Sequence, residues 1–390
     1  MQQVSGDSTV ELLGLRDRLM AWLLDDALPL WWKAGADRQG GGFHEALDHT
    51  GQPAGNVRRA RVQARQVFTY AVASELGWAG PSREAMDHGL AFFLERYRRP
   101  DGFFHNALTG GGQPHDTAPY LYEQAFALLA LATARGIKRD DPSLGAAADA
   151  VLERLTRERR GVAGGYTGFP EPELFQSDPH MHLLEAAMAW EQVSGDPRWR
   201  RLADEVVELC LARFVTAEGL LREYFDATWA PAAGLNGRIV WPGHQFEWAG
   251  LLERWGLARG HDGVRLLARR LYRIGSDHGI DRARGVAIYA LLDDLSVYDP
   301  KARLWSQTEW LKAAIILARS ETDGDERRRY LWDAASAAKA LMRYFDVPIA
   351  GLWQDVMLTD GRWGAEPAPA SSFYHVIDAL RVLFAWPSTR

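Results

Sequence analysis

His244 and Glu247 are the two residues whose types and spacing are best suited to chemistry. They follow Trp241-Pro-Gly, in which the proline and the glycine are typical of a turn that opens a helix. Because they are three positions apart, they share one face of the first helical turn. A histidine beside a carboxylate can move protons at a substrate. The same pair could instead cap the helix and satisfy its dipole, so the rest of the chain must decide between the two interpretations.

Two other histidines, His182 and His375, are predicted near the start of a helix, as His244 is. A helix start disfavours an imidazolium and so favours a neutral imidazole that accepts a proton near pH 7. The pair His180 and His182 also resembles a metal motif, but residues two apart on a helix point to different faces. With no cysteine nearby and no carboxylate at clear ligand spacing, we expect no metal here. His182 is then expected in the pocket and His180 at its rim.

These residues are positioned by a plan that recurs along the chain. A loop with glycine and an aromatic residue precedes a helix with a polar residue near its start, and a partner helix follows. The polar residues are Arg65, Tyr122, His182, His244, Glu309 and His375, separated by 57, 60, 62, 65 and 66 positions. A period of about 60 residues, each built from two helices, indicates twelve helices in six pairs.

Six such pairs close naturally into an all-α double ring, an (α/α)6 barrel, with residues 1–390 in a single catalytic domain. The inner ring would hold six parallel helices, so their N-terminal ends and positive dipoles would meet at one pocket. Two helix starts are specified further. Ser8 to Glu11 has the form of a capping box, and Asp178 is the expected cap of a helix with Pro179 at its first position.

The remaining inward residues have both structural and functional interpretations. Arg65 falls on the inward face of its helix, and a buried arginine needs an anionic partner. That partner could be an inner-ring carboxylate such as Glu309, or an oxyanion that develops on a substrate. The aromatic residues that could either pack in the core or contact a ligand are Tyr122, Trp305 and Trp353.

Composition excludes several classes of protein. The net charge is −6 and the basic residues are scattered, which argues against a nucleic-acid partner. The sequence has no nucleotide-binding glycine motif, no Gly-x-Ser-x-Gly and no His-Glu-x-x-His, so no nucleotide, flavin or zinc cofactor is expected. A lone cysteine, Cys210, together with the lack of a signal pattern or a long apolar stretch, predicts an unanchored cytoplasmic protein. Sixteen tryptophans favour a carbohydrate ligand, because indole stacks on sugar faces.

Several motifs taken together resemble the N-acylglucosamine 2-epimerase superfamily, which includes mannose isomerases, mannose 2-epimerases and cellobiose 2-epimerases. The motifs are Val62-Gln-Ala-Arg-Gln66, Leu121-Tyr-Glu-Gln-Ala-Phe-Ala127, Pro179-His-Met-His-Leu-Leu-Glu-Ala186, Pro242-Gly-His-Gln-Phe-Glu-Trp248, Trp305 with Glu309, and Phe373-Tyr-His375. The resemblance covers nearly the whole chain. It implies the same (α/α)6 barrel and a sugar isomerase or epimerase that needs no cofactor.

The resemblance also implies roles for individual residues. It places His244 and His375 on opposite faces of an opened sugar, with Arg65 near the C1 and C2 oxygens. It assigns ring opening or hydroxyl binding to His182, and it makes Glu247 the residue that orients His244. The residues expected against the substrate are Tyr122, Asp178, Trp305, Glu309 and Trp353. Many members have asparagine where this chain has Asp178, and a pair of tryptophans where it has only Trp305.

The expected reaction starts when a neutral histidine removes the C2 proton of the opened sugar and Arg65 stabilises the resulting cis-enediolate. A proton returned to C1 gives the ketose, whereas a proton returned to the opposite face of C2 gives the epimer. The chain is compact and lacks obvious loops for a disaccharide, which favours a mannose-like aldose–ketose isomerase over the 2-epimerase alternative. Three basic residues could bind a phosphate or stay solvated, namely Arg238, Lys301 and Arg303.

Two other classes of function stay open. An inverting glycoside hydrolase needs two carboxylates about 6.5–9.5 Å apart, for which Glu247 and Glu309 are the candidates. A non-catalytic regulatory or binding protein could share the same barrel, although the histidine pair argues against it. The expected partner is a mono- or disaccharide, with no nucleic acid and no membrane, and the chain is expected to be a monomer or homodimer.

Overall fold

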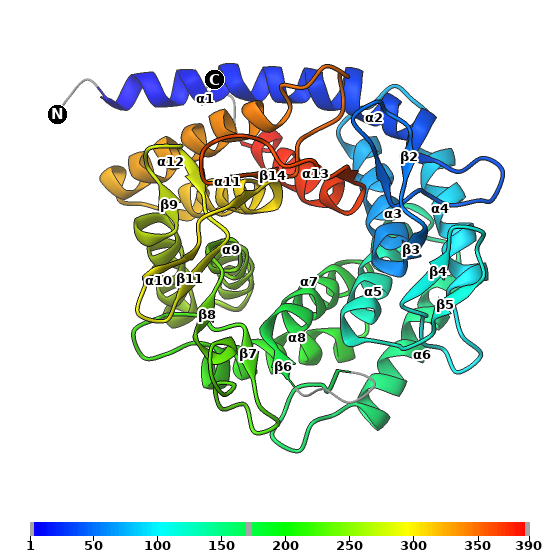
Figure 1. Cartoon of the computed structure of the whole chain (residues 1–390). Helices are drawn as coiled ribbons and strands as arrows, with labels where there is room; N and C mark the ends of the chain where they lie inside the picture. The colour runs from blue at the N-terminus through cyan, green and yellow to red at the C-terminus, as the bar shows by residue number, and fades with distance from the viewer. Residues whose placement is uncertain (1–3, 169–173, 387–390) are drawn as a thin grey trace.

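The helices form two concentric rings (Figure 1) in the computed structural model, which describes residues 4–168 and 174–386. The inner ring consists of α3 (Ala60–Glu75), α5 (Leu121–Ile137), α7 (Ser177–Val193), α9 (Pro242–Arg259), α11 (Leu304–Ser320) and α13 (Ser371–Phe384). Each inner helix contacts the next, and α13 contacts α3, so the ring is closed. The predicted (α/α)6 barrel is confirmed.

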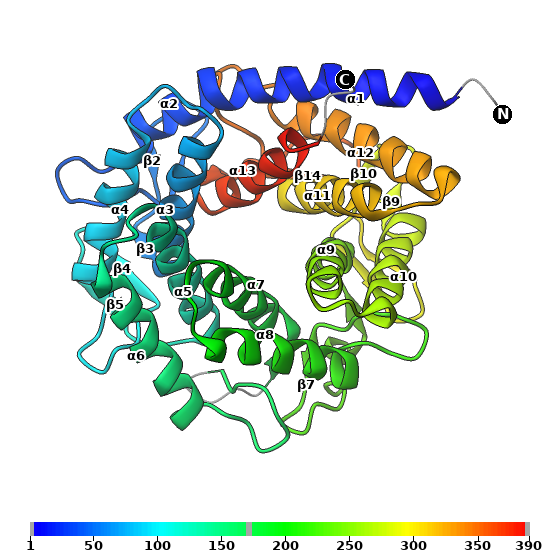
Figure 2. The same ribbon diagram turned by 180° about the vertical axis from the view of Figure 1, so that it is seen from behind.

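The outer ring packs against the inner one, as the view from behind shows (Figure 2). It consists of α4 (Ser82–Arg96), α6 (Pro142–Glu158), α8 (Pro197–Leu209), α10 (Asp262–His278), α12 (Gly324–Tyr344) and α1 (Val4–Ala21), the last continued by η1 (Trp22–Ala27), α2 (Leu28–Leu30) and η2 (Trp31–Gly35). In α10 the buried residues recur every three or four positions, which is typical of a helix with one solvent face. In α11 nearly every side chain is buried, as expected for an inner helix. Within the described ranges, no helix combines the length and apolarity needed to span a membrane.

Short antiparallel strands gather where the inner helices begin, because most of these helices follow directly after a strand. Three sheets have three strands: β15 (Ala368–Pro369), β1 (Ala46–Leu47) and β2 (Pro53–Ala54); β12 (Val297–Asp299), β11 (Ala290–Leu292) and β8 (Ile239–Val240); and β3 (Val57–Arg59), β4 (Ala107–Thr109) and β5 (Pro114–Asp116). Three more are pairs: β10 (Val286–Ala287) with β9 (Ile280–Asp281), β13 (Ala302–Arg303) with β14 (Val356–Met357), and β6 (Phe175–Gln176) with β7 (Tyr224–Phe225). Two helical turns, η3 (Cys210–Phe214) and η4 (Asn236–Arg238), complete the connections.

A repeated hydrogen-bond clamp joins four of the loops to the inner helix that follows each of them. The side chain of Gln63 accepts from the backbone N–H of Phe43 and donates to the Phe43 carbonyl. The same two bonds join Gln124 to Phe104, Gln245 to Leu221 and Gln307 to Ala287. Each clamped backbone residue lies two positions after a glycine with positive φ. The clamp therefore holds the loops over the ends of the inner helices, where the predicted site residues lie.

We expect replacement of Gln245 by Ala to lower the free energy of unfolding by about 1–3 kcal/mol, because the N–H and carbonyl of Leu221 lose their buried partner. Chemical denaturation of the two proteins measures this difference. The matched control is Gln52→Ala, since Gln52 is exposed. Equal losses in both variants would show that the clamp does not stabilise the fold.

Two predicted helix starts are wrong. Helix α1 begins at Val4, so Ser8 lies inside it and cannot cap it. Helix α7 begins at Ser177, one residue before the predicted cap Asp178. The pairing of β6 with β7 sets this start, because the Ser177 N–H donates to the Glu223 carbonyl beside the paired strands. Asp178 consequently points from the first turn of the helix and is free to face the cavity.

The predicted ligand contact of Trp353 is also wrong. Its side chain is fully buried and stacks on Trp31, with 4.6 Å between the ring centroids. It also packs at 5.4 Å from the ring of Phe373. Trp353 follows Gly351 by two positions, so it occupies the place that Phe104 occupies in its own loop, and it is a core residue.

Candidate active site

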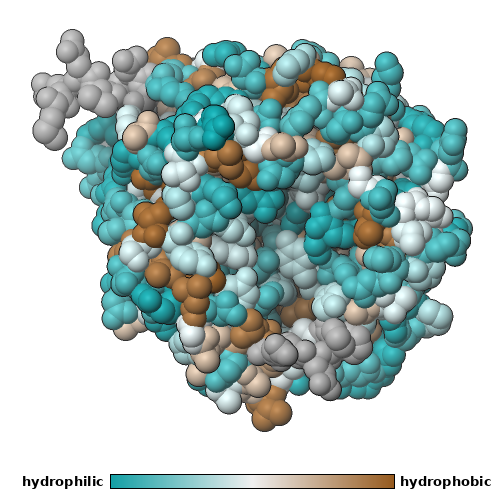
Figure 3. All heavy atoms as spheres, viewed as in Figure 1, coloured by the Kyte–Doolittle hydropathy of each residue, from teal (hydrophilic) through white to brown (hydrophobic). Residues whose placement is uncertain are grey.

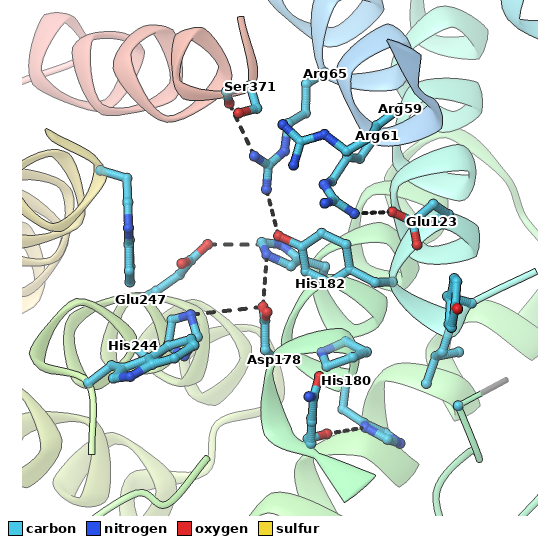
Figure 4. Close-up of a pocket in the computed structure, with 18 of the residues that line it drawn as sticks. Arg59, Arg61, Arg65, Glu123, Asp178, His180, His182, His244, Glu247 and Ser371 are labelled. Carbon is cyan, nitrogen blue, oxygen red and sulfur yellow. Dashed lines mark hydrogen bonds and ion pairs between the residues drawn. The ribbon is translucent and has the colours of Figure 1, made fainter. Parts of the chain in front are cut away.

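One cavity of about 790 Å³ lies where the inner helices begin, and it opens on the hollowed face of Figure 3. Eight of the ten predicted site residues line it: Arg65, Tyr122, Asp178, His182, His244, Glu247, Trp305 and His375. They come from all six inner helices. Figure 4 shows the labelled side chains of Arg65, Asp178, His182, His244 and Glu247 converging on this space.

His244 is held by a carboxylate that sequence reasoning missed. Its Nδ1 lies 2.8 Å from Oε2 of Glu223, a buried residue in the loop before β7. Burial lowers the pKa of His244, but the charge and hydrogen bond of Glu223 outweigh this effect and raise the pKa to about 9. His244 is therefore an imidazolium at neutral pH. The predicted orientation of His244 by Glu247 is wrong, because Glu247 approaches His182 instead.

His375 has the opposite electrostatic environment. Its Nδ1 lies 2.9 Å from Oε1 of Glu309, which is fully buried. Burial lowers the pKa of His375 well below its usual value, and the positive charges of Arg65 and Lys312 lower it further. His375 is therefore neutral at pH 7. Glu309 lies behind His375 and does not line the cavity, so its predicted contact with the substrate is wrong.

His182 lies between three carboxylates, of which Figure 4 shows Asp178 and Glu247. Its Nε2 is 3.3 Å from Oδ1 of Asp178, and its Nδ1 is 3.3 Å from Oε2 of Glu185. Oε1 of Glu247 is 4.0 Å from the same Nδ1. Burial lowers the pKa of His182, but the hydrogen bonds to Asp178 and Glu185 raise it above its usual value. Asp178 also reaches His244, with 3.8 Å between Oδ1 and Nε2, so one carboxylate serves two histidines.

Arg65 is held by neutral groups. It donates to the hydroxyl of Tyr122 at 2.8 Å and to the carbonyl of Ser371 at 3.1 Å. The suggested salt bridge to Glu309 is wrong, because Glu309 pairs with Lys312 at 2.7 Å. Since neutral partners leave the guanidinium charge uncompensated, Arg65 can stabilise an oxyanion at the cavity wall.

Trp305 provides an aromatic wall beside both catalytic candidates. Its ring centroid lies 5.2 Å from that of His244 and 5.9 Å from that of His375, so both imidazoles border one part of the cavity. The ring packs closely on the backbone of Gly243, where an added Cβ would come within 2.3 Å of it. Glycine at this position therefore allows Trp305 to lie against the start of α9.

His180 lines the cavity, in keeping with its predicted place at the rim, and it also has a structural role. Its Nε2 accepts from the N–H of Tyr166 at 3.0 Å, and its Nδ1 lies 3.0 Å from the carbonyl of Gln176. Burial lowers its pKa to about 4. Tyr166 follows Gly164 by two positions, so His180 replaces in this repeat the glutamine clamp of the others.

Two overlapping groups of side chains have the ligand types of a cation site. Possible ligand atoms of His182, Glu185 and Glu247 lie within 4.8 Å of one another, as do those of Glu247, Glu309 and His375. In the second group, Lys312 already supplies a positive charge to Glu309. The expectation that the enzyme needs no metal stays a prediction.

The distance between the carboxylates of Glu247 and Glu309 argues against an inverting glycoside hydrolase. Glu247 and Glu309 bring oxygen atoms within 4.8 Å, which is less than the roughly 6.5–9.5 Å that this mechanism needs for a water molecule. Glu309 is in addition shielded from the cavity. These two carboxylates therefore do not form the predicted acid–base pair of such an enzyme.

Comparison with known proteins gives consistent results. The profile of the N-acylglucosamine 2-epimerase family matches residues 41–379. A protein of Rhizobium meliloti (strain 1021) named mannose-6-phosphate isomerase is 46% identical over 367 residues, covering 93% of this chain and 95% of its own length. A D-mannose isomerase of Marinomonas mediterranea is 22% identical, covering 79% of this chain and 82% of its own.

Solved structures show the same fold at low sequence identity. A D-mannose isomerase superposes with a TM-score of 0.83 and 20% identity, covering 96% of this chain and 97% of its own. A cellobiose 2-epimerase of Bacillus thermoamylovorans superposes with a TM-score of 0.84 and 15% identity, covering 95% of this chain and 98% of its own. The barrel is therefore shared by isomerases and epimerases, and the site chemistry must distinguish them.

Proposed function

The chain belongs to the N-acylglucosamine 2-epimerase family, and from this premise we propose that it interconverts a mannose-type aldose and its ketose. It is an enzyme of the sugar isomerase and epimerase class, as its curated relatives are. The observation that carries the proposal is the pair of histidines in opposite protonation states beside one cavity. His375 is a neutral base and His244 is a charged acid, which is the division of roles that proton transfer requires.

We assign the proton transfer at carbon to His375. With its Nδ1 bonded to Glu309, its Nε2 is free to take the C2 proton of the open-chain aldose. The electron pair moves through the C1–C2 bond to O1 and gives a cis-enediolate. The same nitrogen then returns the proton to C1, and the carbonyl forms at C2. A positioned base of this kind contributes roughly 10²–10⁴-fold to the rate.

Two positively charged side chains, Arg65 and His244, act on the substrate oxygen atoms. Arg65 faces the negative charge that develops on O1, and removal of such a donor typically costs about 10²–10³-fold in rate. The His244 imidazolium donates a proton to O1 of the enediolate, and the neutral imidazole that results takes the proton of the O2 hydroxyl as the C2 carbonyl forms. We assign ring opening to His182 and Asp178, which share a hydrogen bond at the cavity wall. Tyr122, Glu247 and Trp305 complete the contacts with the sugar hydroxyls and its apolar face.

The alternative outcome is 2-epimerisation, in which His244 would return the proton to the opposite face of C2. Relatives named as isomerases at 46% and 22% identity favour the ketose product. The test is incubation with mannose in D₂O, followed by NMR. We expect fructose that carries deuterium at C1. Glucose with deuterium at C2 and no fructose would identify an epimerase instead, and no turnover of either mannose or mannose 6-phosphate would overturn the assigned function.

The mouth of the cavity supports a phosphorylated substrate. Arg59 and Arg61 line it, paired with Glu45 and Glu123 respectively, and Arg61 stands four residues before Arg65 on the helix, about 6 Å nearer the opening. An aldose with C1 at Arg65 would therefore place its far end beside Arg61. Of the basic residues singled out from the sequence, Arg303 lines the cavity and pairs with Asp355 at 2.7 Å, whereas Arg238 is occupied by surface carboxylates.

We accordingly expect a higher kcat/KM for mannose 6-phosphate than for mannose. Arg61→Gln should lower kcat/KM for the phosphate about 10–100-fold, because a charge-assisted hydrogen bond is worth about 1.5–3 kcal/mol. It should change kcat/KM for mannose much less. Arg61→Lys keeps the charge opposite Glu123 and is the control for loss of that buried ion pair. Equal losses for both sugars would exclude phosphate binding at Arg61.

We also propose two broader properties. The buried, single Cys210 supports a reducing cytoplasmic compartment. The closed ring of helices supports one catalytic domain over residues 1–390, and the expectation of a monomer or homodimer stays a prediction.

A further inference from the structure

A buried lysine lies behind the proposed base, away from the cavity. Lys312 is on α11, and its side chain is only 8% exposed. Its Nζ lies 2.7 Å from Oε2 of Glu309 and 3.0 Å from Oδ2 of Asp378. Both carboxylates are at most 1% exposed. Burying a lysine and two carboxylates costs free energy unless the charges pair closely. The presence of this buried cluster therefore calls for an explanation.

The lysine belongs to two matched contacts between α11 and α13. Glu309 and Lys312 are three residues apart on α11, and His375 and Asp378 are three residues apart on α13. Glu309 bonds His375, and one turn further along the helices Lys312 pairs with Asp378. Because Lys312 also pairs with Glu309, the two contacts form one connected chain that ends at the His375 ring.

The protonation of Glu309 decides which nitrogen of His375 carries the hydrogen. An ionised Glu309 accepts from Nδ1–H and leaves the lone pair on Nε2, facing the cavity. A protonated Glu309 would donate to Nδ1, so the ring hydrogen would sit on Nε2 and no base would face the sugar. Burial and the charge of Glu247 hold the pKa of Glu309 well above its usual value even though Lys312 lowers it, so loss of Lys312 would favour the protonated form further.

We propose that Lys312 is a positioning residue that keeps Glu309 ionised, so that Glu309 holds the Nδ1–H tautomer of His375 and leaves Nε2 as the base. The proposal deepens the assigned function and rests on it for the role of His375. It does not rest on it for the tautomer, which is a property of the resting protein. Lys312 touches no part of the cavity and acts only through Glu309.

The first test compares Lys312→Met with Asp378→Asn. Lys312→Met removes the counter-ion of Glu309, and we expect kcat to fall about 10²-fold or more, with KM within about threefold of the wild-type value. Asp378→Asn also breaks the buried pair but leaves Lys312 with Glu309, and Asp378 has a further partner in Arg381 at 2.5 Å. Its kcat should fall less than about tenfold. Lys312→Arg, which restores a cation, should recover part of the kcat lost in Lys312→Met.

The second test reads the tautomer directly by NMR of protein labelled with ¹⁵N at its histidines, with the His375 signals assigned by their loss in His375→Gln. We expect the ring hydrogen on Nδ1 in the wild type and on Nε2 in Lys312→Met. An unchanged tautomer in Lys312→Met would overturn the proposal. So would equal loss of kcat in Lys312→Met and Asp378→Asn, which would indicate a purely structural pair. If the wild type shows no isomerase activity, the assigned function fails while the tautomer measurement still tests Lys312.

Discussion

Replacing His375 with Gln should lower kcat for aldose–ketose conversion by about 10²–10⁴-fold, because the only group assigned to carry the carbon-bound proton is lost. The amide keeps the size and polarity of the side chain but cannot accept a proton at neutral pH. KM should change little, since other residues hold the sugar. Steady-state kinetics of product formation measure both constants.

A second readout separates this loss from misfolding. Wild-type enzyme should exchange the C2 hydrogen of the aldose with D₂O, and His375→Gln should not. The matched control is His180→Gln, because glutamine occupies the equivalent clamp position in four other repeats and both ring nitrogens of His180 lie within hydrogen-bond distance of backbone groups. C2 exchange that persists in His375→Gln would show that another residue is the base.

Replacing Glu223 with Gln should shift the pH dependence of the reaction. Burial lowers the pKa of His244, and Glu223 raises it to about 9, so the wild-type kcat/KM should fall on the alkaline side near pH 9. Without the Glu223 charge this limb moves to lower pH. At pH 8 the variant should lose more than about tenfold in kcat/KM, since each pKa unit below the working pH costs about tenfold in the protonated fraction. The acidic limb, set by the neutral His375, should move far less.

The same substitution should change how stability depends on pH. The folded-state pKa of His244 lies above its usual value near 6.5, so its contribution to stability is complete below pH 6.5 and is lost as pH rises through about 9. Glu223→Gln should flatten this alkaline decline. Glu218→Gln is the control, because Glu218 lies in the same loop but is exposed. An alkaline decline of kcat/KM that stays near pH 9 in Glu223→Gln would mean that a group other than His244 sets this decline.

The period of the sequence was sufficient to predict the barrel and the gathering of most site residues. Gaps of 57 to 66 residues between Arg65, Tyr122, His182, His244, Glu309 and His375 place one of them on each inner helix. Glu309 is the one member of this set that does not line the cavity. It lies on its inner helix at the expected spacing, but its side chain is behind His375. Periodicity fixes the helix and its end, but it does not fix how deep a side chain lies.

Partners of the histidines were harder to predict because they come from other elements. Helical spacing pairs His244 with Glu247, yet the actual partner, Glu223, lies 21 residues earlier in a loop. A sequence signal for such loop residues exists. Glu223 is four positions after Gly219, just as Glu45 is four after Gly41. The same offset gives Asn106, Tyr289 and Asp355, three residues that line the cavity or bond to its walls.

The proposed chemistry requires that His244 and His375 have opposite charge states, and an NMR titration of their ring nitrogens measures these states. With ¹⁵N-histidine labelling and assignment by single substitutions, we expect a His244 ring protonated on both nitrogens at pH 7.5 that loses a proton near pH 9. We expect a neutral His375 ring at the same pH and well below it. A neutral His244 or a charged His375 at pH 7.5 would contradict the division into acid and base.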